Sequence, residues 1–170
     1  MKRSRRLSSI SALVILAIVL PACSSASGGV ELAPPVLPGK ADFSTPQAAV
    51  RTYVEYTDYA YRMANSDIAS PAATPYEGVR VDSYIQLNRE KDRGIEQRLV
   101  SFTERSVSKE GTRTLLAASE EWRYRYFSLT GREYTSPVYT ASYDTTYTLV
   151  RDKKGWLVDK VDARALTPVK

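Results

Sequence analysis

The stretch that decides the fold is residues 113–128, RTLLAASEEWRYRYFS, in which two kinds of side chain alternate. One parity is apolar or aromatic around a single carboxylate, and comprises Leu116, Ala118, Glu120, Trp122, Tyr124 and Tyr126. The other parity is polar or charged, with Ser119, Glu121, Arg123 and Arg125. Because successive side chains of a strand point to opposite faces, the pattern predicts a long strand with one buried and one solvated face.

The flanking sequence predicts three more strands. Residues 138–151 place one apolar set on a single face, namely Tyr139, Ala141, Tyr143, Tyr147 and Leu149. Val100, Phe102 and Val107 indicate an earlier strand, and residues 156–161 a last one, with turns at 109–111, 130–133 and 152–155. One apolar face is typical of antiparallel strands, so we expect a four-stranded antiparallel sheet in which the middle two strands are long.

The sequence before these strands predicts two helices. Thr45 and Pro46 suit a helix start, and apolar residues then recur at spacings of three and four up to about Asn65. Residues 66–76 contain two prolines and indicate a loop or a broken short helix, and a second helix is expected over 81–97. The fold class is therefore α+β, with helices packed on a curved antiparallel sheet.

Two segments of this domain resemble the nuclear-transport-factor-two-like (cystatin-like cone) superfamily. They are STPQAAV at residues 44–50, which resembles the opening of its first helix, and the closing hairpin from Tyr147 to Val158. The resemblance covers most of residues 44–164 and implies a cone with a cavity between sheet and helices. The superfamily includes enzymes, transport factors and domains that only bind or pack, so the likeness defines no activity.

Residues 1–22 have the pattern of an export signal, with a basic start and an apolar run from Ile10 to Leu20. These 11 residues are too few to cross a bilayer core, which needs about 20. The end of the leader, Leu20-Pro21-Ala22-Cys23, resembles the lipobox of bacterial lipoproteins. That resemblance implies cleavage before Cys23 and a lipid on its sulfur, which would hold the chain at the extracytoplasmic face of the cell membrane. An uncleaved anchor and a cysteine present by chance are the alternatives.

The predicted organisation has four parts. A signal peptide spans 1–22, the lipidated Cys23 and a flexible Ser-, Gly- and Pro-rich tether span 23–42, the domain spans 43–166, and a tail spans 167–170. Four of the 24 basic residues precede residue 7, so removing the leader leaves 20 against 19 acidic residues. A nearly neutral mature chain argues against a nucleic-acid partner. With no His and one Cys, the composition excludes imidazole catalysis and Cys/His metal sites, and we expect no cofactor and no metal.

The candidate pocket combines Glu120 with the aromatic residues Trp122, Tyr124, Tyr143 and Tyr147. The resemblance to ketosteroid isomerases and polyketide cyclases makes a carboxylate with tyrosines the natural set of candidate catalytic residues. A carboxylate facing such a cavity could carry a proton. In the alternative account, Glu120 lies near a strand end or a bulge and points to water.

The main hypothesis is a lipid-anchored, non-catalytic binding or protein-interaction domain of the bacterial envelope, with an envelope protein as partner. The alternative is a small-molecule enzyme using Glu120 and the tyrosines. We expect Trp122 and Trp156 to be largely buried, the tyrosines to fill the cone, and Glu120 to be at least partly exposed. An open pocket with Glu120 buried at its base would instead favour the enzyme.

Overall fold

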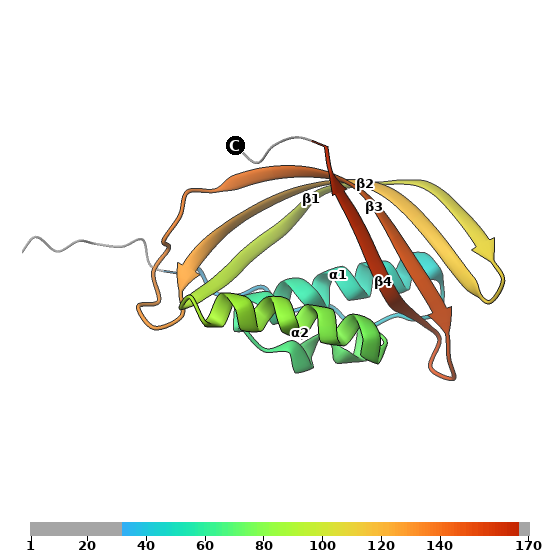
Figure 1. Ribbon diagram of the computed structural model, residues 1–170, viewed down its shortest axis with the longest axis horizontal. Helices are drawn as coiled ribbons and strands as arrows, with labels where there is room; N and C mark the ends of the chain where they lie inside the picture. Colours follow the sequence, from blue (N-terminus) through green and yellow to red (C-terminus); the bar gives the residue numbers. More distant parts are fainter. Residues whose placement is uncertain (1–31, 167–170) are drawn as a thin grey trace, which may run out of the picture.

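The computed structural model describes residues 32–166. Helices α1 (Pro46–Met63) and α2 (Pro75–Arg89) are linked by two 3₁₀ turns, Ser66–Ile68 and Ser70–Ala72. The strands that follow are β1 (Arg93–Glu110), β2 (Arg113–Ser128), β3 (Tyr139–Arg151) and β4 (Trp156–Ala165). They form one antiparallel sheet in the order β1-β2-β3-β4, and this sheet curves over the two helices, which cover one face (Figure 1). The predicted α+β fold class is confirmed.

Helix α1 begins where the sequence predicts. The Thr45 Oγ1 atom accepts a hydrogen bond from the Ala48 N–H at 3.1 Å, and Pro46 occupies the first turn, where its missing N–H has no cost. The helix ends with Ala64 in the left-handed conformation, at φ 50°, one residue before the expected cap at Asn65. Its buried residues face the sheet and include Ala49, Val50, Tyr53, Val54 and Ala60.

The second helix lies earlier than predicted, and its last expected turn is a strand. Thr74 caps α2, because its Oγ1 accepts from the Glu77 N–H at 3.5 Å, and Pro75 follows in the first turn. Residues 93–97, expected to be helical, belong to β1 and pair with the end of β2, with Arg93 opposite Ser128. As a result β1 and β2 are the two longest strands, rather than the middle two.

The alternation along β2 is confirmed from Thr114 to Glu120, whereas Phe127, on the opposite parity near the end of the strand, is fully buried. Leu116 and Ala118 are fully buried, and they share the core with Leu149 from β3 and Val158 from β4. The expectation for the tryptophans is wrong, since Trp122 and Trp156 are only half-buried and pack at the border of this core. Trp122 lines a cavity between the sheet and the helices, and Trp156 begins the edge strand β4, so neither ring is enclosed by the core.

The Pro-rich segment before α1 has no helix or strand and contacts α1 through hydrogen bonds. Arg62 Nη2 donates to the Ala33 carbonyl at 2.5 Å, and the Gly39 N–H donates to Glu55 Oε2 at 2.9 Å. The predicted signal peptide, Cys23 and the tail at 167–170 lie outside the described residues. Over residues 32–166, no helix combines the length and the apolar character that a membrane crossing requires.

Candidate functional site

A cavity of about 520 Å³ lies between the concave face of the sheet and the two helices. Its volume is within the range of roughly 300–1,000 Å³ that is typical of small-molecule sites. Eight aromatic side chains line it: Tyr53, Tyr61, Tyr84, Trp122, Tyr124, Tyr126, Tyr143 and Tyr147. The cavity also contains two carboxylates, Glu77 and Glu120, and one guanidinium, that of Arg80.

Many of the residues that line the cavity lie on β2 and β3, at alternate positions that face the helices. The parity of β2 that buries Leu116 and Ala118 continues along the strand as Glu120, Trp122 and Tyr124, which line the cavity. On β3, Glu120 is directly opposite Tyr143 in the sheet register. The five side chains grouped from the sequence, Glu120, Trp122, Tyr124, Tyr143 and Tyr147, therefore all line one cavity.

Glu120 accepts hydrogen bonds from three neutral donors in the wall of the cavity. Its Oε2 atom accepts from Trp122 Nε1 at 2.8 Å and from Thr145 Oγ1 at 3.0 Å. Its Oε1 atom accepts from the Tyr147 hydroxyl at 2.5 Å. The residue is 5% exposed and forms no salt bridge among the described residues.

The expectation of a filled cone with a partly exposed Glu120 is therefore wrong, as is the alternative in which Glu120 points to water. The tyrosines line the walls instead of meeting at the centre. Tyr147 is turned toward Glu120 by its hydrogen bond, and Tyr124 packs against Tyr126 and Tyr139 at the open side, with ring centroids 5.8 and 5.4 Å apart. The space between these side chains is the cavity of about 520 Å³.

Glu77 is a second buried carboxylate that the sequence analysis did not include. It is 3% exposed, accepts from the Tyr53 hydroxyl at 2.7 Å, and forms an ion pair with Arg80 at 2.8 Å. The residue was missed because the second helix was expected to begin at Val81. The sequence Thr74-Pro75-Tyr76-Glu77 has the capping-box spacing that marks a helix start, and this signal could have revealed it.

The two carboxylates influence the tyrosines that contact them. Burial, and then the negative charge of Glu120, raises the pKa of Tyr147 well above its ordinary value. Burial and the charge of Glu77 raise the pKa of Tyr53 in the same way. Both phenols therefore remain protonated donors at any physiological pH.

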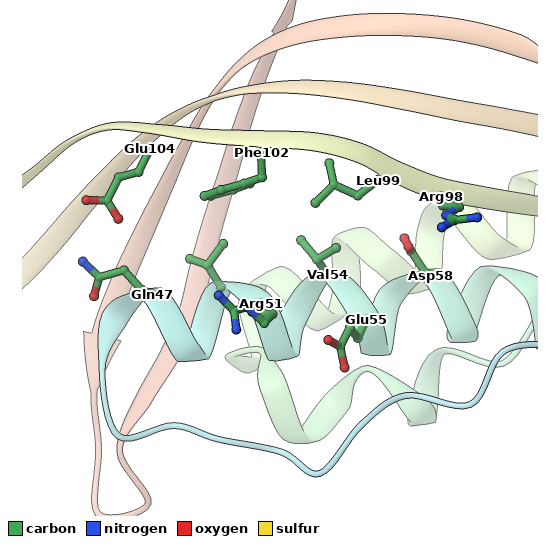
Figure 2. A pocket seen from close by; sticks show the side chains of 10 residues that line it. Gln47, Arg51, Val54, Glu55, Asp58, Arg98, Leu99, Phe102 and Glu104 are labelled. Atoms are coloured by element: carbon green, nitrogen blue, oxygen red, sulfur yellow. The ribbon is translucent and has the colours of Figure 1, made fainter.

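A second hollow, of about 560 Å³, lies outside the cone between α1 and the edge strand β1. Figure 2 shows Leu99 and Phe102 pointing from β1 toward the helix, and Val54 pointing back from α1. Charged side chains border this groove: Arg51, Glu55, Asp58, Arg98 and Glu104. Its floor is apolar.

Asp58 lies in the partition between the groove and the cone. Its Oδ1 atom accepts a hydrogen bond from Nε2 of Gln97, at 2.5 Å, and Gln97 lines the cone cavity. Burial raises the pKa of Asp58 to about 8, with smaller contributions from the charges of Glu55 and Glu120, against the lowering effect of the Gln97 bond. At neutral pH Asp58 is therefore mainly protonated.

The functional groups that line the cavity include carboxylates, phenols, one indole and one guanidinium. Within residues 32–166 no group of three His, Cys, Asp or Glu side chains is placed to hold a metal ion. Three of the roughly four lone-pair sites of the Glu120 carboxylate are occupied by protein donors. The carboxylate is thus oriented rigidly, with little capacity left to accept a proton from another molecule.

Comparison with known proteins supports the fold. The structure is similar to the intermembrane space region of the chloroplast protein ARC6, with a TM-score of 0.53, 17% sequence identity, and coverage of 71% of this chain and 98% of that one. An NTF-2 like protein of unknown function from Shewanella oneidensis matches with a TM-score of 0.45, 10% identity and coverage of 70% and 98%. A cystatin-like protein from Caulobacter vibrioides matches with a TM-score of 0.46, 12% identity and coverage of 72% and 90%.

No protein-family model and no curated protein matches the chain. At these identities the similarity concerns the fold alone. Together, the curved four-stranded antiparallel sheet and the helices on its concave face form an α+β cone, and the similarity to the ARC6 region supports this fold.

Proposed function

We propose that this chain is a ligand-binding domain of the bacterial cell envelope, held at the extracytoplasmic membrane face by a lipid on Cys23. The observation that carries the binding role is the aromatic cavity of about 520 Å³ with Glu120 fastened in its wall. A cavity of this size lowers the stability of a domain, so a domain that serves only as a structural element would be expected to fill it with side chains. The leader and lipobox pattern of residues 1–23 supports the location.

Two candidate roles use the cavity, and the hydrogen bonds of Glu120 favour binding over catalysis. By burial alone, a carboxylate beside an open cavity favours the enzyme alternative, in which Glu120 transfers a proton. A general base, however, needs a free lone pair aimed at the substrate. Here Trp122, Thr145 and Tyr147 all donate to the carboxylate. Such a group suits recognition, because its orientation is set before the ligand arrives.

The binding role can be tested by tryptophan fluorescence. The sequence has two tryptophans, so the variant Trp156→Phe leaves Trp122, in the cavity wall, as the sole reporter. A fragment library of neutral and charged compounds should include members that change its emission in a saturable way. Ala163→Phe, which adds a ring at the cavity, should abolish that change. The matched control Asp162→Phe, at the neighbouring position on β4 that does not line the cone, should not.

The enzyme alternative makes a different prediction for the same fragments. Bound compounds should be recovered unchanged by mass spectrometry after long incubation if the domain only binds. Conversion that stops in Glu120→Gln but continues in Glu121→Gln would establish the enzyme and refute the binding role.

The location has its own experiment. Cells producing the full chain are labelled with a fatty acid, and the protein should carry the label and fractionate with membranes. Cys23→Ala should leave a precursor without label. Equal labelling of the variant would exclude Cys23 as the lipid attachment site without affecting the binding proposal.

A further inference from the structure

Glu120 is a buried charge without a countercharge among the described residues. Buried carboxylates in proteins are normally paired with a cation or a metal. The partners of Glu120 are an indole N–H and two hydroxyl groups, all neutral. These donors orient the carboxylate but leave its negative charge uncompensated at the edge of a cavity large enough for a small molecule.

The other charges at the cavity are already matched. Glu77 forms an ion pair with Arg80 at 2.8 Å, and Arg80 also donates to the Val161 carbonyl at 3.0 Å. The lining thus has two carboxylates and one guanidinium, a net charge of −1 that resides on Glu120. A cation entering the cavity would neutralise this charge, whereas an anion would add to it.

The aromatic side chains of the cavity also favour a cation. Aromatic faces carry the negative part of the ring quadrupole and attract cations, tryptophan most strongly. Trp122 lies beside Glu120 and donates a hydrogen bond to it from the indole N–H. The rings of Tyr124 and Tyr143 also line the cavity. One tyrosine of this lining already binds a cation in this way, since the Arg93 guanidinium lies 4.3 Å from the centroid of Tyr126.

We infer that the ligand of the cone cavity is a small organic cation, an ammonium group on an apolar body, whose charge is recognised by Glu120 and Trp122. This inference rests on the proposed binding function and adds the chemical class of the ligand. The cation would occupy the space between the carboxylate and the aromatic wall, and its apolar body would lie against the tyrosines toward the open side.

The test uses three molecules of nearly equal shape that differ in charge. Choline carries a quaternary ammonium group, 3,3-dimethylbutan-1-ol is its uncharged copy, and 3,3-dimethylbutyrate is an anion of the same outline. The binding of each molecule to the full mature chain is measured by isothermal titration calorimetry. Choline should bind roughly tenfold or more tightly than the alcohol, a difference of the size that a desolvated cation–π contact produces, and the anion should bind least.

Two variants assign the effect to the proposed residues. Glu120→Gln should weaken choline binding and so reduce the preference for choline over the alcohol, while the alcohol binds as before. Glu121→Gln, on the solvated parity of the same strand, should change neither affinity. If Glu120→Gln does not fold, a measurement on the wild-type protein still tests the inference. Added NaCl should weaken the binding of choline and leave the affinity for the alcohol unchanged.

The outcomes separate this inference from the function on which it rests. Equal affinity for choline and the alcohol would overturn the cationic ligand and leave the binding role intact. Failure of all three molecules to bind, while neutral fragments change the Trp122 emission, would also overturn it. Absence of binding by every fragment and every member of the set would refute both.

Discussion

Replacing Glu120 should test whether the hydrogen bonds at the cavity wall organise the site. In Glu120→Ala, three donors lose their shared acceptor: the indole N–H of Trp122 and the hydroxyl groups of Thr145 and Tyr147. A hydrogen bond to a charged group contributes about 1.5–3 kcal/mol, and bonds that share one acceptor do not add fully. Water in the cavity can replace part of the loss. We therefore expect the free energy of unfolding to fall by about 3–5 kcal/mol.

Glu120→Gln should cost less, for a reason visible in the donor geometry. The Trp122 N–H can only donate, so the amide oxygen must take the place of Oε2, where it keeps the bonds from Trp122 and Thr145. The amide NH₂ then faces the Tyr147 hydroxyl, which has to turn its proton away. One bond is exchanged for a weaker one, and the expected loss is about 1–2 kcal/mol.

The assay is urea denaturation followed by circular dichroism, with thermal melting as a second measurement. At about 3 °C per kcal/mol for a domain of this size, the midpoint should fall by roughly 10–15 °C in the alanine variant and by a few degrees in the glutamine variant. Glu121→Ala, the neighbour on the opposite face, should stay within about 0.5 kcal/mol of wild type. If the alanine variant also lies within 1 kcal/mol of wild type, the reasoning about Glu120 is refuted.

Three further predictions concern other parts of the domain. The pKa of Asp58 is about 8 in the folded state and about 4 in the unfolded state, so between these values only the folded state holds the proton. The free energy of unfolding should therefore fall as pH rises through this range. Urea denaturation at pH 5 and 8 should show a smaller fall in Asp58→Asn, and parallel falls would contradict the raised pKa. Gly94→Ala should be strongly destabilising, because its new Cβ would lie 2.1 Å from the Phe127 ring, whereas Gly78→Ala, in open space on a helix, should add up to about 1 kcal/mol. Thermal melts that rank this pair in reverse would show that the Phe127 ring moves aside. Trp156→Ala should cost roughly 2 kcal/mol, less than the 3–5 of a fully buried ring, and a melting point unchanged from wild type would place the side chain outside the core.

The side-chain pattern was sufficient for the strands from about residue 100 onward, because strand alternation is a local property, but it did not reveal that β1 begins at Arg93. Each residue of β2 needs only its neighbours to show which face it takes, and Leu116 and Ala118 are buried as their parity predicts. Glu120 lies on the same parity, but its burial was not predicted, because we expected it to be partly exposed. The start of α1 was equally local, since Thr45 caps a backbone N–H three residues away. The second helix was misplaced because its apolar stripe is interrupted by polar residues, and the Thr74 cap was a better signal than periodicity.

The sequence by itself determined the fold class, the face on which Glu120 lies and the aromatic residues beside it, because these follow from alternation over a few residues. Only the tertiary structure decided that the tyrosines leave a cavity, since that depends on the curvature of the sheet and on the contacts each ring makes across strands. It also brought Glu77 and Tyr53, 24 residues apart, into the same wall, and gave Glu120 donors from two strands. The volume of the cavity and its net charge depend on residues that are far apart in the sequence, so no local sequence pattern predicts them.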